Sequence, residues 1–148
     1  MNRATPKMRE FAERLMADEE EGNKASTKVR TGFQVVERLR PQFAMLMGIA
    51  GFRAILSRAL ALANAEVRWL RAVHVKADGS LEGLEDLRAQ LDPGELFEGR
   101  VVLLAQLLGL MAAFIGEDLT WRMMREVWPK VPFNNLDFMK GEKNEKAE

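Results

Sequence analysis

The feature that most constrains the fold is an apolar run of fifteen residues, Val101–Ile115, in which Gln106 is the one polar side chain. A helix that is apolar on every side is buried, either in a protein core or in a membrane. A membrane-spanning helix needs about 20 apolar residues, and charged residues flank this run on both sides. Asp92 and Pro93 are typical of a helix start, because Asp caps free N–H groups and proline needs no hydrogen bond there. The sequence therefore predicts a core helix over residues 93–128 and no membrane span.

A second long helix is predicted over residues 42–73, and it is apolar on most sides. At about 100° per residue, Arg53, Ser57, Asn64, Arg68 and Arg71 fall within an arc of about 60°. The opposite side carries Phe52, Ile55, Leu56, Ala59, Leu60, Ala63, Val67 and Leu70. Between the two lies a strip of small residues, Ala54, Ala61 and Ala65. This strip predicts a close crossing with the small residues of the 93–128 helix.

Proline and glycine predict where these segments bend or end. Pro41 separates the 42–73 helix from a shorter apolar segment, 32–40, and we expect a break or kink there. Gly48 and Gly51 are typical of a bend or a tight crossing, because each costs a helix about 1 kcal/mol relative to alanine. An N-terminal helix is expected from Pro6 to Gly22, with Thr5 as its cap.

The segment between the long helices is less regular. Val73 and Val75 alternate with polar residues and predict a short extended piece, followed by a turn at residues 77–80. Residues 81–91 are expected to form a short helix capped by Ser80. The stretch from Asp78 also resembles the start of a calcium loop, but Ala89 stands where the loop needs its bidentate glutamate. We therefore expect a turn and no metal site.

The predicted fold is all-α: a compact bundle of four to five helices, two of them long and apolar. Residues 1–132 form a single domain, and residues 133–148 form an extended, largely disordered tail, since the apolar residues of 133–139 lack regular spacing and residues 140–148 are highly charged. One protomer has few other elements with which to cover two long helices that are apolar on most sides. A homodimer that shares them is therefore expected, because such interfaces bury core-like surface.

Composition excludes several classes of chemistry. The chain lacks cysteine, which excludes disulfides and zinc–thiolate sites and fits a cytoplasmic protein, and the N-terminus lacks the apolar region of a signal peptide. Tyrosine is absent and His74 is the single histidine, although histidine is the commonest general acid or base. Neither standard glycine-rich phosphate loop is present. We expect no cofactor, and an enzymatic function is not favoured.

Charge is balanced overall but unevenly distributed. The chain has 22 basic and 22 acidic residues, which argues against a dedicated nucleic-acid-binding protein. Residues 24–76 hold ten basic and two acidic residues, whereas residues 77–126 hold four and ten. The arginines of the 42–73 helix, Arg53, Arg68 and Arg71, could hold phosphates or carboxylates. The favoured interpretation is that they pair with acidic residues 82–98 in the same fold or across a dimer.

The apolar residues Trp121, Met124 and Trp128 are candidates for a protein interface, because tryptophan and methionine are common at such contacts. Ordinary core packing is the simpler interpretation. The function predicted is a non-enzymatic interaction or adaptor module of a bacterial-type cytoplasmic system, with a protein partner. The alternative is a regulatory protein that binds an anionic ligand or nucleic acid through residues 24–76.

Overall fold

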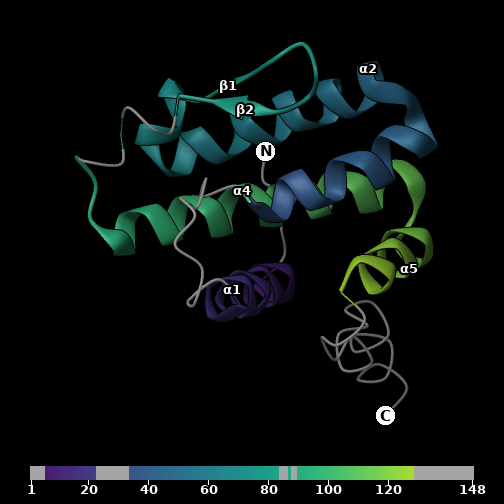
Figure 1. Ribbon diagram of the computed structural model, residues 1–148, viewed down its shortest axis with the longest axis horizontal. Helices are drawn as coiled ribbons and strands as arrows, with labels where there is room; N and C mark the ends of the chain where they lie inside the picture. Colours follow the sequence, from purple (N-terminus) through teal and green to yellow (C-terminus); the bar gives the residue numbers. More distant parts are fainter. Residues whose placement is uncertain (1–5, 23–33, 84–86, 88–89, 129–148) are drawn as a thin grey trace.

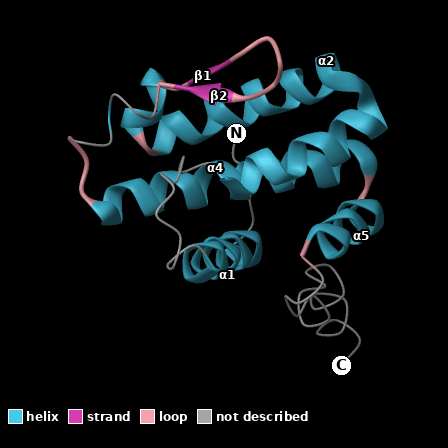
Figure 2. Cartoon of the chain, viewed as in Figure 1, coloured by secondary structure: helices cyan, strands magenta, loops and turns pink. Residues whose placement is uncertain are grey.

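The computed structural model describes residues 6–22, 34–83, 87 and 90–128. Helices dominate these residues, and two short strands form a hairpin (Figure 2). In chain order the elements are α1 (Pro6–Gly22), α2 (Gln34–Glu66), the 3-10 helix η1 (Arg68–Ala72), β1 (His74–Val75), β2 (Leu81–Glu82), α4 (Pro93–Ile115) and α5 (Glu117–Val127). The predicted all-α class with two long apolar helices is confirmed, as are the bounds of the first helix. The predicted tail, 133–148, lies outside the described residues.

Helix α4 is the central element and contacts α1, α2 and α5. In Figure 1 it runs through the middle, with the second half of α2 on one side and α1 and α5 on the other. The predicted start is confirmed: Asp92 accepts a hydrogen bond from the Glu95 backbone, and the Glu95 side chain accepts one from the Asp92 backbone. Residues 101–111 are all buried. The apolar run is therefore a protein core within this structure.

The predicted continuation of this helix to residue 128 is wrong. Helix α4 ends at Ile115, because Gly116 has φ 94° and ψ 154°, a conformation that is essentially restricted to glycine. The Gly116 N–H still donates to the Ala112 carbonyl, and α5 begins at the next residue in a new direction. A single residue without a Cβ atom thus turns one predicted helix into two.

The predicted break at Pro41 is also wrong, whereas the bend that was one of the two expectations at Gly48 is confirmed. Helix α2 continues through Pro41, whereas Gly48 has φ 82° and ψ 156°. Figure 1 shows α2 folding back on itself at this point. We call residues 45–49 the elbow. Proline near the beginning of a helix removes one backbone hydrogen bond, which the first half of α2 tolerates, whereas a glycine with positive φ reverses the chain.

Helix α2 ends earlier than predicted, at Glu66, because Val67 is extended (φ −120°, ψ 102°) and η1 follows. The expected extended piece at residues 73–76 is confirmed as β1, which pairs antiparallel with β2. The expected turn is confirmed by a hydrogen bond from the Lys76 N–H to the Ser80 carbonyl, 2.7 Å. Ser80 does not cap a helix, since Leu81 begins β2. Residues 84–86 and 88–89 of the predicted short helix lie outside the described residues.

The predicted core face of α2 is confirmed, but the predicted close crossing is wrong. Phe52, Leu56 and Ala59 are fully buried. The small residues Ala54, Ala61 and Ala65 are exposed instead, so no described helix crosses α2 on that side. The reason is that α4 packs against the large apolar side chains of α2, whose burial stabilises the fold more than burial of alanine does.

An ion pair between α1 and the end of α2 makes stability depend on pH. Arg9 donates two hydrogen bonds to the Glu66 carboxylate, of 2.6 and 2.8 Å. The hydrogen bond from Arg9 lowers the pKa of Glu66 from its ordinary value of 4.5. Since the folded pKa is lowered, the pair stabilises the fold above pH 4.5 and the contribution is lost as pH falls through the lowered pKa. Both side chains are about one-third exposed, and solvent screening limits the effect to roughly 1 kcal/mol or less.

We expect Glu66→Gln and Arg9→Gln each to lower the free energy of unfolding at pH 7, and to have a smaller effect at pH 3. The measurement is urea denaturation of both single variants and the double variant at the two pH values. The coupling energy from this cycle should be favourable at pH 7 and smaller at pH 3, because the contribution is lost as pH falls through the lowered pKa of Glu66. A coupling that is equal at both pH values contradicts the ion pair.

Candidate functional site

The predicted arginine site does not lie along one helix face. Arg53 belongs to α2, but Arg68 and Arg71 belong to η1, beyond the end of α2 at Glu66. All three side chains are exposed, and none forms an ion pair or side-chain hydrogen bond with another described residue. Arg58, which belongs to the predicted basic segment 24–76 but not to the predicted arginine site, is also exposed and has no such partner among the described residues. Within the described residues, the expected pairing with acidic residues 82–98 is therefore not seen, and a binding role stays a prediction.

The predicted interface residues lie in the interior. Trp121, Met124 and Trp128 are 8%, 0% and 4% exposed. The Trp121 ring meets Phe11 of α1 edge to face at 5.2 Å between centroids. The guanidinium of Arg38 lies 4.9 Å from the centroid of the Trp128 ring and donates to the Val127 carbonyl. These contacts join α5 to α1 and α2, and a role in binding a partner stays a prediction.

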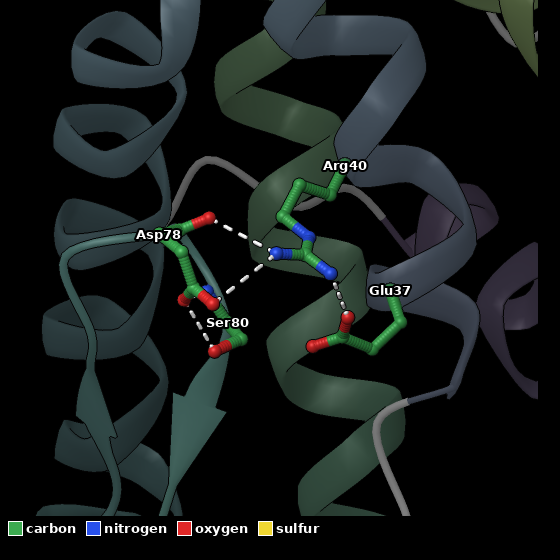
Figure 3. Close-up of polar contacts among 4 residues, drawn as sticks. All are labelled: Glu37, Arg40, Asp78 and Ser80. Carbon is green, nitrogen blue, oxygen red and sulfur yellow. Dashed lines mark hydrogen bonds and ion pairs between the residues drawn. The ribbon is translucent and has the colours of Figure 1, made fainter.

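The best-defined polar cluster fastens the hairpin turn to the first half of α2. Figure 3 shows Arg40 between Glu37 and Asp78, with Ser80 beside Asp78. Arg40 donates to the Asp78 carbonyl oxygen at 3.0 Å and to the Glu37 carboxylate at 2.6 Å. The Ser80 hydroxyl and backbone N–H both donate to the Asp78 carboxylate, at 2.6 and 3.0 Å. These hydrogen bonds lower the pKa of Asp78, so this carboxyl is poorly suited to act as a general acid.

The turn held by this cluster lies on the elbow. Gly79 is buried, and a Cβ atom there would come within 2.9 Å of the Ile49 side chain and 3.2 Å of Arg40. The hairpin therefore covers one side of the elbow. The cluster thus has a structural role: it holds the turn against α2 and leaves the other side of the elbow open.

Large apolar side chains of the elbow remain exposed, including that of Ile49, which the hairpin turn covers only in part. Met45, Leu46 and Ile49 are 88%, 47% and 42% exposed, and Phe114 near the end of α4 is 64% exposed. The elbow and the junction between α4 and α5 lie at the same end of the molecule (Figure 1). We call these four residues the apolar end. Sequence reasoning missed these four residues. The apolar residues around Met45 are distributed over all sides of the helix, which was a signal that one neighbouring helix would not cover all of them.

A second open surface follows along α2 after the elbow. At about 100° per residue, the exposed residues Ala50, Ala54, Ser57, Ala61 and Ala65 fall within an arc of about 80°. Arg53 borders this arc on one side and Arg58 on the other. We call these seven residues the outer face. It is the side opposite the buried Phe52 and Leu56.

Two helices are long and apolar enough to cross a membrane by length and composition. For α2, 22% of the most apolar stretch of Val35–Glu66 is buried, and for α4 the share is 67%. Sequence reasoning weighed only the run in α4. The reversal at Gly48 divides α2 into two shorter helices, and the second carries Arg53 and Arg58. The low burial of α2 leaves it open to contact with a lipid surface.

Among the residues that the structure describes, no group of three or more His, Cys, Asp or Glu residues is placed to hold a metal ion. Comparison with protein-family models, with curated proteins and with solved structures finds no match.

Proposed function

We propose that the chain is a non-enzymatic protein-interaction module of the cytoplasm and that the apolar end contacts its partner. The observation that carries this proposal is the exposure of Met45 and Phe114, 88% and 64%, on the two long helices that also supply core residues. Large apolar side chains that gather on a surface are typical of protein–protein contacts. Covering them releases water at a gain of about 25 cal/mol per Å² of apolar surface. The homodimer expected from the sequence is one form of this proposal.

A second candidate function is binding of an anionic ligand or nucleic acid. It is supported by the exposed side chains of Arg53, Arg58, Arg68 and Arg71, which no described acidic residue neutralises. Guanidinium groups bind phosphates and carboxylates through paired hydrogen bonds. Binding of nucleic acid through phosphate contacts weakens steeply as salt is raised, whereas an apolar protein contact does not. Salt dependence therefore separates the two candidates.

The test compares the wild-type chain with the double variant Met45→Ser, Phe114→Ser. Tagged proteins are used to recover partners from native-source lysate at low and high salt, with light scattering to detect self-association. We expect a stoichiometric partner that survives high salt, and at least tenfold less of it on the double variant. Because both residues are exposed, thermal stability should change little.

The matched control is Arg122→Ser, an exposed position on α5, which should leave partner recovery unchanged. Recovery that is equal on the wild type and on the double variant contradicts the proposal. Material that absorbs at 260 nm and elutes with salt favours the second candidate instead. Loss of solubility without detergent would indicate a lipid-contacting protein.

A further inference from the structure

We infer that the element bound by this module is an amphipathic α-helix of another protein, with acidic residues on both sides of its apolar stripe, and that it docks along the outer face of α2. This inference rests on the proposed function and names the chemistry of the partner. It joins two observations: the open apolar surface that begins at the elbow, and the arginines that border it.

The shape of the outer face suits a helix. Ala50, Ala54, Ser57, Ala61 and Ala65 present small side chains along one exposed arc, and the large side chains of Met45, Leu46 and Ile49 stand exposed at its elbow end. Helix axes approach to about 8 Å only where the side chains at the contact are small. An apolar stripe on a docked helix would thus lie close to α2, with its end covering the elbow.

The charge of the outer face indicates acidic flanks on the partner. Arg53 and Arg58 stand on opposite sides of the small-residue arc, and neither has an acidic partner among the described residues. Arg68 and Arg71 follow in η1, also exposed and also unpaired within the described part of the chain. Carboxylates on both sides of a docked helix would meet these guanidinium groups with charge-assisted hydrogen bonds.

The same charges argue against a second copy of α2 as the occupant. Two outer faces packed against each other would bring two Arg53 and two Arg58 side chains to one interface. Like charges that face each other across an interface repel and disfavour the association. A partner with the opposite charge removes this repulsion and adds attraction, so the acidic helix fits better than self-association through this face.

The small side chains also favour a protein partner over a lipid surface or a nucleic acid as the occupant of the outer face. A helix that lies in a membrane surface gains from large apolar residues inserted into lipid, and alanine and serine offer little area for insertion. Phosphate groups would satisfy the arginines but would leave the apolar arc and the elbow uncovered. A peptide helix with acidic flanks matches both features at once.

The experiment places a photo-crosslinking amino acid at Ala61 of the full chain in native-source cells. The control carries it at Arg122, which is exposed on α5. After irradiation, the crosslinked segment is identified by mass spectrometry. We expect position 61, and not position 122, to capture a segment of another protein whose apolar residues recur at helical spacing between acidic ones. Capture of lipid, nucleic acid or a segment of this same chain overturns the inference, as does no capture above the control.

Two variants test shape and charge separately. Ala61→Trp places a large side chain at an exposed position and blocks the close approach of a partner helix to α2. The double variant Arg53→Glu, Arg58→Glu reverses the charge on both sides of the small-residue arc. Each should reduce capture of the partner at least tenfold, measured with the crosslinker at Ala54 and with unchanged thermal stability. The matched charge control is Arg122→Glu. If Met45→Ser, Phe114→Ser loses the partner while both of these variants keep it, the proposed function stands and this inference fails.

Discussion

Replacing Phe52 with alanine is expected to lower the free energy of unfolding by about 3–5 kcal/mol, the range for large aromatic residues in a core. The side chain is fully buried on α2. Its ring stacks against Phe43 at 6.3 Å between centroids, which joins the two halves of α2 across the elbow. The variant would leave a cavity at this junction, because the helices on either side are held by other contacts. Denaturation by urea, followed by circular dichroism, measures the loss.

The matched control for this prediction is Phe114→Ala, which removes the same side chain from a position that is 64% exposed. Its effect should lie within about 0.5 kcal/mol of zero, as for most surface substitutions. The contrast tests which way the two long helices face. Equal losses at both positions would contradict the assignment of Phe52 to the core and of Phe114 to the apolar end.

Replacing Gly83 with alanine is expected to cost about 3 kcal/mol or more, from backbone strain combined with overpacking. Gly83 has φ 105°, and a Cβ atom there would stand 2.3 Å from the backbone carbonyl oxygen of Ala72. A backbone atom cannot rotate away as a side chain can, so the hairpin must move off η1. Hydrogen exchange of β1 and β2, together with urea denaturation, distinguishes local detachment from global loss.

Gly116→Ala is the control, because it shares the positive φ, 94°, but has no atom within 4 Å of the Cβ position. It should show the conformational cost alone, about 1–3 kcal/mol. Gly83→Ala should therefore be the more damaging variant, and its effect should concentrate in the hairpin. Equal losses, or unchanged exchange of β1 and β2, would contradict the close contact with Ala72.

Local chemistry made the starts of α1 and α4 predictable. Asp92 and Pro93 begin α4 where the sequence places the start, because a cap and an N-terminal proline act on the backbone within one turn. Pro6 begins α1 for the same reason. These signals need no knowledge of the rest of the fold, which is why they survive into the structure unchanged.

The glycines show where sequence reasoning reaches its limit. Gly48 and Gly116 adopt positive φ and redirect the chain, whereas Gly51 and Gly109 remain inside helices. The residue type is identical, so its freedom alone does not say which conformation it adopts. Tertiary packing decides, through the neighbours that each helix must meet. Pro41 is the converse case: its lost hydrogen bond costs less than the packing of the first half of α2 contributes.

The candidate surfaces were predicted only in part. The arginines are exposed, but Arg68 and Arg71 left the predicted arc because α2 ends early. The aromatic character of Trp121 and Trp128 suits a core and an interface equally well, and both are buried in this chain. Whether the residues of the apolar end are exposed depends on which helix packs against which face. The spacing of residues within one segment does not contain that information.

The place of α4 in the chain order has a consequence for protein synthesis. The buried faces of α1 and α2 rest on α4, whose core residues follow the end of α2 by tens of positions. A ribosome adds about 5–20 residues each second, so α1 and α2 emerge seconds before the helix that covers them. Helices form in microseconds, far faster than synthesis proceeds, so the apolar residues of α1 and α2 stay uncovered for that time because α4 is absent. A chaperone that recognises apolar helical surface would therefore find its longest opportunity on the nascent chain between α2 and α4.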